Sequence, residues 1–206
     1  MNNHNLLQIK GGTNCSVYLY KFGGERSIIK ICGENKLDRH IGRLVMSDYF
    51  RIKNKLSSLG IFVPITMNVY LTSENNADLV IIESYEGVSL REILVNKRVS
   101  KNRKTISVKK CLDFIDRLPE NIPLDTNPGN FCFRKDASIA FVDFIPPDPW
   151  KYKDNINIQS RLKEIFPSMK SPFYKHKYLS YYKNKYRVER LSFHCRKLFG
   201  GIDKSL

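Results

Sequence analysis

Apolar and polar residues alternate along the first part of the chain, which is the pattern of half-buried β-strands. The alternation predicts strands at 6–10, 15–22 and 27–32. Glycine pairs, Gly11-Gly12 and Gly23-Gly24, separate these strands, and short glycine-containing turns are typical of β-hairpins. We therefore expect an antiparallel meander at the start of the chain.

The pattern then changes to a helical period. Apolar residues between 36 and 59 recur at mostly three- and four-residue steps, which predicts an amphipathic helix ended by Gly60. Strands are predicted at 61–71 and 79–85, on either side of a polar turn. Together these elements predict an α+β protein that begins with a five-stranded antiparallel sheet and one helix.

The rest of the chain returns mostly to helical periodicity. Ser89 is expected to cap a helix over 88–95, and a basic polar link is expected at 96–104. The further predicted elements are helices at 105–118, 158–166, 172–186 and 188–199 and short strands at 131–133 and 138–142. The part that follows the sheet is therefore expected to be mostly helical.

The charge of the chain favours an anionic partner. The 206 residues include 35 Lys and Arg against 20 Asp and Glu, a net charge of +15, and 42% of the residues are hydrophobic. Over 151–206 there are 14 basic residues against 4 acidic ones. A basic surface of this kind attracts nucleic acid, phosphorylated substrates or acidic membranes. The alternative is a solvated lysine-rich surface with no specific partner.

The cysteines and the apolar runs bear on where the protein works. The five cysteines are scattered and form no Cys-x-x-Cys pair, which predicts reduced, packed thiols rather than a disulfide framework or a zinc site. No apolar run approaches the roughly 20 residues that span a bilayer. The N-terminus lacks the apolar segment of a signal peptide. We therefore expect a cytoplasmic protein without a membrane span.

The segment 122–147 contains the candidate chemistry. It carries Asp125 and Asn130, then two short apolar runs joined by a polar turn, and Asp143 at the end of the second run. Folded as a hairpin, the runs bring these three residues to the same end, where their oxygen atoms suit a divalent metal held around phosphates. Each residue alone is equally typical of a turn or a strand end, so the spacing carries the prediction.

Lys30 is the second candidate, because it interrupts the apolar strand predicted at 27–32. Its ammonium group must face either an anion or water. A lone lysine on an alternating strand is commonly an outward residue. The Gly11-Gly12 turn upstream favours the other interpretation, in which a flexible glycine turn and a lysine hold the same phosphates.

The order of these elements resembles the protein-kinase-like fold, nearest to the aminoglycoside phosphotransferase and choline kinase branch. The resemblance rests on Lys30, the connector 83–87, and Asp125-x-x-x-x-Asn130 followed by Asp143. It implies a two-lobed member with a reduced C-terminal part, residues 1–85 forming a nucleotide-binding N-lobe and 86–206 a mostly helical C-lobe.

The resemblance also implies roles for individual residues. Asp125 would be the catalytic carboxylate, and Asn130 and Asp143 would hold Mg²⁺ on ATP. Phosphate contacts would come from Lys30 and the glycine turn. The implied cofactor-binding residues are Gly11, Gly12, Lys30, Glu83 and Tyr85, the last two lying in the connector beside the adenine.

The chain departs from the family pattern in two places. Pro123 and Leu124 stand where the family has His and Gly before the catalytic Asp, so the usual packing anchor of that loop is absent. The helix that should offer a glutamate to Lys30 has Asp48 in its middle, a shorter acid.

These observations predict a phosphotransferase that depends on ATP and Mg²⁺ and acts on a hydroxyl group. Because the chain is basic, we expect an acceptor, a small molecule or a protein, that carries negative charge. One alternative is a pseudokinase, a nucleotide-binding scaffold that docks a partner through its basic C-terminal helices. Another is a nucleic-acid-binding protein, in which tyrosines and lysines interleaved over 170–197 bind the strand.

Overall fold

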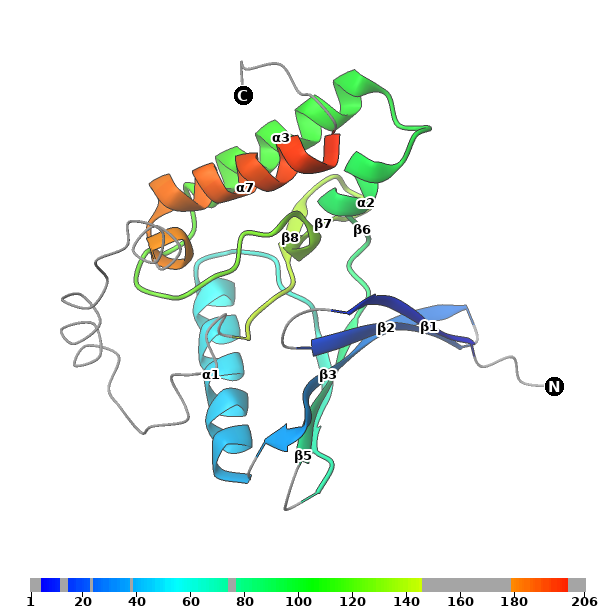
Figure 1. Ribbon diagram of the computed structural model, residues 1–206, viewed down its shortest axis with the longest axis vertical. Helices are drawn as coiled ribbons and strands as arrows, with labels where there is room; N and C mark the ends of the chain where they lie inside the picture. The colour runs from blue at the N-terminus through cyan, green and yellow to red at the C-terminus, as the bar shows by residue number, and fades with distance from the viewer. Residues whose placement is uncertain are drawn as a thin grey trace. The chain divides into compact units, whose positions relative to one another are not determined.

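The computed structural model describes residues 5–11, 15–22, 24–37, 39–73, 77–145 and 179–199. The chain divides into two compact units (Figure 1). The first combines Met1–Arg51 with Pro64–Tyr85, and the second combines Ile52–Val63 with Glu86–Leu206. The helix predicted at 158–166 and Gly12 lie outside the described residues, as does most of the helix predicted at 172–186.

The first unit contains a five-stranded sheet in which every neighbouring pair is antiparallel, as predicted. Its strands follow the order β1-β2-β3-β5-β4. They are β1 (Asn5–Gly11), β2 (Cys15–Phe22), β3 (Glu25–Leu37), β4 (Thr66–Leu71) and β5 (Ala77–Ser84). Strand β5 lies inside the sheet, between β3 and β4, and its Leu79, Val80 and Ile81 are buried.

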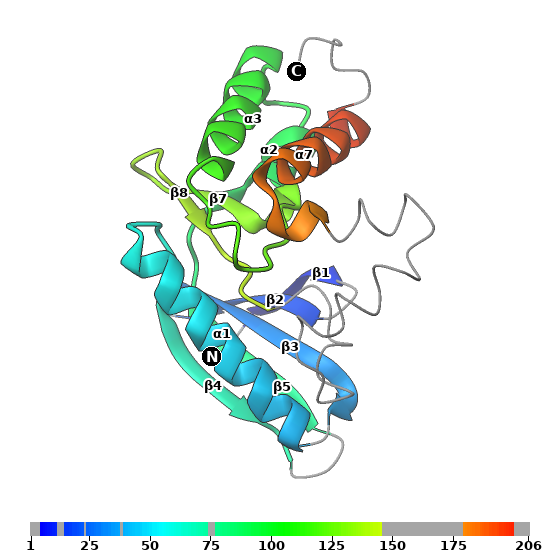
Figure 2. The ribbon, with the colours of Figure 1, turned by 90° about the vertical axis from the view of Figure 1, so that its left-hand side faces the viewer.

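Helix α1 (Arg39–Ser58) lies against this sheet (Figure 2). Its part in the first unit, up to Arg51, includes the buried Val45 and Tyr49. It begins three residues later than predicted, because β3 continues through Leu37. The strand predicted at 61–71 begins only at Thr66. Pro64 lies just before it, and a proline has no N–H group for a strand ladder.

The register of β2 and β3 corrects the prediction that all five cysteines are reduced thiols. Eight successive pairs, from Phe22↔Glu25 to Cys15↔Cys32, keep one register, so the two cysteines face each other directly. They form a disulfide. Their 17-residue separation in sequence conceals this contact, since only the strand pairing shows that they are opposite. Cys111, Cys132 and Cys195 are buried and form no disulfide.

The second unit contains a small antiparallel sheet and several helices in its described part. The sheet follows the order β6-β7-β8, with β6 (Val88–Ser89), β7 (Phe131–Phe133) and β8 (Ile139–Phe141). The helices include α2 (Leu90–Val95), α3 (Lys101–Ile115) and α7 (Asn184–Phe199). Four phenylalanine rings form a row of edge-to-face contacts. The ring centroids are 5.9 Å apart for Phe114 and Phe131, 5.5 Å for Phe131 and Phe141, and 6.2 Å for Phe141 and Phe144. These contacts fix the hairpin against α3.

Two helix starts differ from the prediction and one agrees with it. Ser89 caps α2 in a capping box with Glu92, as expected. Helix α3 begins at Lys101, within the predicted link 96–104, because the Ser100 side chain accepts a hydrogen bond from Arg103 N. Helix α7 begins at Asn184 and includes residue 187, where the sequence pattern suggested a break.

Gly87, in the connector, is required by its surroundings. Its φ is +118°, and a Cβ atom there would lie 2.2 Å from the Phe133 carbonyl oxygen. A side chain therefore meets both backbone strain and a backbone clash.

None of the helices in the described ranges is long and apolar enough to cross a bilayer.

Candidate functional site

The loop before β7 places two of the predicted site residues. The Asp125 carboxylate accepts a hydrogen bond from Asn127 N at 3.1 Å, and the Asn127 side chain accepts one from Gly129 N at 3.2 Å. Asn127 thereby caps a single 3₁₀ turn, η1 (Pro128–Asn130). The turn-forming composition noted in the sequence thus builds a real turn, and that turn carries Asn130 into the hairpin.

Asn130 joins the other two predicted residues. Its amide nitrogen donates to the Asp125 backbone oxygen at 2.7 Å and to Asp143 Oδ2 at 3.3 Å. Both partners are acceptors, so they determine which end of the amide is the nitrogen. Oδ1 of Asn130 accepts no hydrogen bond within the described residues. Every fully buried side-chain oxygen in that part of the chain has a partner, so Oδ1 is not fully buried. This oxygen is therefore open to a further ligand.

Asp143 follows β8 and closes the hairpin beside Asn130. Val142 N donates to the Asn130 backbone oxygen at 3.1 Å. Asp143 Oδ1 accepts a hydrogen bond from Ile145 N at 3.2 Å, and its Oδ2 faces the Asn130 amide. The structure thus brings Asp125, Asn130 and Asp143 to the same end of the hairpin.

The side-chain oxygens of Asn130 and Asp143 are suitable ligands for a magnesium ion that also binds phosphates. Mg²⁺ is commonly bound by one or two protein oxygens together with substrate phosphates rather than by a complete protein cage. Asn130 Oδ1 and the Asp143 carboxylate are oxygen ligands of that kind. No group of three or more His, Cys, Asp or Glu side chains within the described ranges could hold a metal ion.

Arg190 is a site residue that the sequence interpretation missed. Its Nε donates to Asp125 Oδ1 at 3.0 Å, and its guanidinium lies 4.9 Å from the centroid of the Tyr181 ring. Both side chains of the ion pair are partly buried, at 20% and 23% exposure. Oδ1 of Asp125 therefore has two donors, whereas Oδ2 has none among the described residues. The Asp125 carboxylate therefore has one oxygen, Oδ1, that is fixed by hydrogen bonds, and a second, Oδ2, that can accept another.

A second arginine on α7 holds the chain just before Asp125. The Arg187 guanidinium donates to the backbone oxygens of Pro119 at 3.0 Å, Ile122 at 2.7 Å and Tyr181 at 2.8 Å. Its Nη1 also donates to Asn184 Oδ1 at 2.7 Å. Arg187 is fully buried, and this burial lowers its pKa to about 10. The Arg187 guanidinium is still charged at neutral pH. A charged donor makes stronger hydrogen bonds to carbonyl oxygens than a neutral one does.

Further contacts link α7 to the same loop. Asn184 N donates to Glu120 Oε1 at 2.8 Å, and Lys183 Nζ donates to Glu120 Oε2 at 2.9 Å. The Lys183 contact is the main cause of a lowered Glu120 pKa. Thr126 Oγ1 donates to the Arg187 backbone oxygen at 3.2 Å. Helix α7 therefore anchors the loop that precedes Asp125.

The basic residues of α7 thus have a structural use that composition alone does not reveal. The sequence shows a lysine- and arginine-rich helix, which suggests a docking surface. Only the folded chain shows that Arg187 and Arg190 turn inward onto a loop more than 60 residues away, as the separations of 65 to Ile122 and 65 to Asp125 record.

In the first unit, Lys30 belongs to a buried polar network. Its Nζ lies 2.6 Å from Glu83 Oε2, with side-chain exposures of 9% and 1%. The Tyr49 hydroxyl bonds to Glu83 Oε1 at 2.5 Å and to Thr66 Oγ1 at 2.7 Å. Burial and the neighbouring Glu83 charge raise the pKa of Tyr49 far above its ordinary value, so its hydroxyl remains protonated. A buried lysine paired with a carboxylate is thereby held in one place.

The acid that meets Lys30 comes from the neighbouring strand. Asp48, the candidate on α1, bonds to Arg51 Nε at 2.8 Å. Glu83 instead lies on β5, between Ile28 of β3 and Thr66 of β4. Its side chain supports Lys30, and its backbone lies within the sheet. The residues that follow, from Tyr85 onward, are outside the strand ladder.

The other residues predicted to contact the nucleotide are Gly11, Gly12 and Tyr85. Gly11 is the last residue of β1 and lies opposite Ser16. Gly12 is outside the described residues. The Tyr85 ring lies 5.5 Å from the Arg26 guanidinium, which forms a cation–π contact at the end of the sheet.

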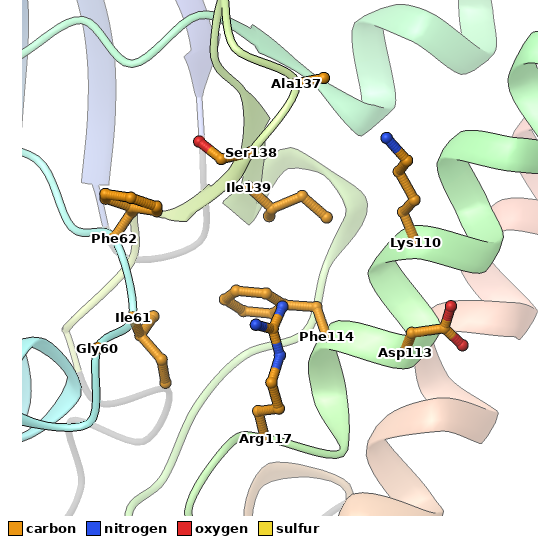
Figure 3. A pocket seen from close by; sticks show the side chains of 10 residues that line it. All are labelled: Gly60, Ile61, Phe62, Lys110, Asp113, Phe114, Arg117, Ala137, Ser138 and Ile139. Atoms are coloured by element: carbon orange, nitrogen blue, oxygen red, sulfur yellow. The ribbon is translucent and has the colours of Figure 1, made fainter.

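A cavity of about 350 Å³ opens in the second unit at the turn end of the β7–β8 hairpin (Figure 3). Its apolar floor includes the buried Ile61, Phe114 and Ile139, and the Arg117 guanidinium lies 5.0 Å from the Phe114 ring centroid. Asn130 and Asp143 occupy the opposite end of this hairpin. The cavity is therefore separate from the candidate site.

Comparison with protein-family models and with curated proteins finds no match to this sequence. The functional argument therefore depends on the geometry of the site.

Proposed function

We propose that this protein is a small kinase-like phosphotransferase that uses ATP and Mg²⁺ to phosphorylate a hydroxyl group. The observation that carries the proposal is the arrangement around Asn130. Its amide nitrogen is bonded to Asp125 and Asp143, while Asn130 Oδ1 and Asp125 Oδ2 have no donor within the described residues. A metal ligand and a proton acceptor are thus left open beside each other.

In this proposal Asp125 receives the acceptor hydroxyl. Oδ1 is held by Asn127 N and Arg190, so Oδ2 is the atom that faces the hydroxyl and takes its proton. Fixing one oxygen of a carboxylate reduces the orientational freedom that the reaction would otherwise have to remove. Asp125 therefore acts as an oriented base rather than as a nucleophile.

Asn130 Oδ1 and the Asp143 carboxylate would hold the metal. Bound Mg²⁺ would neutralise charge on the nucleotide phosphates. Lys30, positioned by Glu83, would contact nucleotide phosphates. The buried Glu83–Tyr49–Thr66 network supports this role, because it holds the lysine in place inside an apolar sheet.

Arg190 favours an acceptor that carries negative charge. Its Nε is bonded to Asp125, but its two terminal nitrogens donate no hydrogen bond within the described part of the chain. A guanidinium with free donors beside the proposed base can bind a phosphate or a carboxylate of the acceptor. This agrees with the net charge of +15, which disfavours a polycationic acceptor.

The proposal is tested by ligand-dependent melting temperature and by ATP turnover. We expect ATP with Mg²⁺ to raise the melting temperature of the wild type, because a ligand that binds only the native state stabilises it. Asp143→Asn should lose the magnesium-dependent part of the shift. Lys30→Met should lose most of the nucleotide shift, whereas Lys21→Met, an exposed lysine on the neighbouring strand, should keep it.

Turnover separates the two interpretations that involve nucleotide. Asp125→Asn should keep the Mg-ATP shift and lose γ-phosphate transfer or release. A wild-type shift without any turnover would instead identify a nucleotide-binding scaffold. Absence of any shift by ATP, with or without Mg²⁺, would refute nucleotide binding.

A further inference from the structure

A group of cations that we name the basic corner gathers in the second unit, where the start of α3 meets the end of α7. Helices α3 and α7 lie side by side, and Lys104 Nζ lies 5.2 Å from the Phe199 ring centroid (Figures 1 and 2). The basic corner consists of Lys97, Arg98, Lys101, Arg103, Lys104, Arg196 and Lys197. All of them are exposed except Lys104, which is partly exposed.

The loop that carries the first of these cations is ordered by its own side chains. Asn96 Oδ1 accepts a hydrogen bond from Arg98 N at 2.9 Å, and Ser100 Oγ accepts one from Arg103 N at 3.3 Å. The loop is thereby held between the end of α2 and the first turn of α3. The cations are presented by a formed surface, so binding does not have to order the backbone first.

Within the described residues, no carboxylate forms an ion pair with the basic corner. The ion pairs among the described residues involve other cations, such as Lys183 with Glu120 and Arg190 with Asp125. Among the described residues, Lys104 of the corner makes a cation–π contact with Phe199. Unpaired cations that repel one another are costly to gather on a folded surface unless an anionic partner stabilises them.

Exposed apolar side chains accompany the cations. Val95 is 53% exposed and comes just before Lys97, and Ile106 is 48% exposed and lies one helical turn after Arg103. Phe193 is 59% exposed, one turn before Lys197. Cations interspersed with exposed apolar side chains are typical of surfaces that rest in the interface of an anionic bilayer.

We propose that the basic corner docks this protein on the surface of a membrane that contains anionic lipid. The side chains favour lipid over nucleic acid. Of the three exposed apolar residues beside the cations, Val95 and Ile106 are aliphatic and cannot stack on bases, and Phe193 is the one aromatic residue among them. Residues 95–106 contain no aromatic residue at all. In contrast, aliphatic side chains that enter the headgroup region add to the attraction of the cations.

The test is sedimentation of the full chain with vesicles of phosphatidylcholine, with or without phosphatidylglycerol. We expect binding only to the vesicles that contain phosphatidylglycerol, and weaker binding as salt is raised. The variant K97Q/K101Q/K197Q should bind about a hundredfold more weakly, since each cation near an anionic leaflet contributes roughly a factor of five. The matched control is K21Q/K55Q/K135Q, which removes the same charge from exposed lysines elsewhere.

Each outcome decides the proposal. Binding that the control retains and the corner variant loses supports it, and so does a further loss with Ile106→Gln, which keeps the charge. Failure to bind phosphatidylglycerol vesicles overturns the proposal, as does an equal loss in both triple variants. Binding of a single-stranded oligonucleotide that depends on the corner, without vesicle binding, overturns it in favour of nucleic acid. Circular dichroism establishes that every variant is folded.

Discussion

Replacement of Arg187 by methionine tests whether α7 anchors the loop that carries Asp125. Methionine keeps much of the apolar stem of the arginine and removes the whole guanidinium. The carbonyl oxygens of Pro119, Ile122 and Tyr181 then lose a charged donor, as does Asn184 Oδ1. The substitution therefore releases the loop from the helix at several points while it changes the apolar packing little.

The expected loss of stability follows from the burial of these acceptors. The bond to Ile122 is fully buried, and a buried acceptor left without its donor costs about 1–3 kcal/mol. The oxygens of Pro119 and Tyr181 are partly buried and regain some hydration from water. Removal of the buried charge also returns part of its desolvation cost. We expect a net loss of about 3 kcal/mol, which is a large share of a typical stability of roughly 5–15 kcal/mol.

The assay is urea unfolding followed by far-ultraviolet circular dichroism. Arg187→Lys should lose roughly half as much stability, because an ammonium group keeps the charge but cannot reach several carbonyls in the planar geometry of a guanidinium. Arg196→Met, on the exposed side of the same helix, is the matched control and should change stability by less than about 0.5 kcal/mol. If Arg187→Met unfolds at the same urea concentration as the control, Arg187 does not anchor the loop.

Three further predictions address other parts of the chain. Gly87→Ala should destabilise the protein by several kcal/mol, because backbone strain adds to a clash with the Phe133 carbonyl; Gly60→Ala, which has a positive φ but open space, should lose only about 1 kcal/mol by thermal unfolding. Equal losses would show that the close approach is unimportant. The native pKa of Glu120 is lowered below 4.5, so its contacts with Lys183 and Asn184 should stabilise the fold above that pH and fade as the pH falls through the native pKa. The melting temperature of Glu120→Gln should therefore lie below that of the wild type at neutral pH and match it once the pH is well below the native pKa of Glu120; a constant difference would contradict this. Burial raises the pKa of Cys195 to about 12 and also raises that of Cys111, so the native thiols should resist iodoacetamide at mildly alkaline pH. After unfolding, mass spectrometry should find three alkylated cysteines without reductant and five with it, whereas five without reductant would exclude the Cys15–Cys32 disulfide.

Local patterns in the sequence were enough to predict much of the architecture. Alternation and glycine turns predicted the five-stranded antiparallel sheet, and the spacing from Asp125 to Asn130 and on to Asp143 predicted the hairpin that brings them together. These predictions succeed because a strand, a turn or a helix cap depends on neighbours a few residues away. Where a local signal was overlooked, as with Ser100 at the start of α3, the element was misplaced by four residues.

The partners of the charged groups could not be obtained in that way. Lys30 pairs with Glu83, Cys15 pairs with Cys32, and Arg190 reaches Asp125. Each pairing depends on strand register or on how a distant helix packs, and many acids or thiols in the chain are equally suitable by type. The sequence by itself therefore determined the local elements and the candidate metal-binding motif. Only the tertiary structure decided which side chains hold that motif in place, because a long-range contact is selected by packing of the whole unit rather than by the residues beside it.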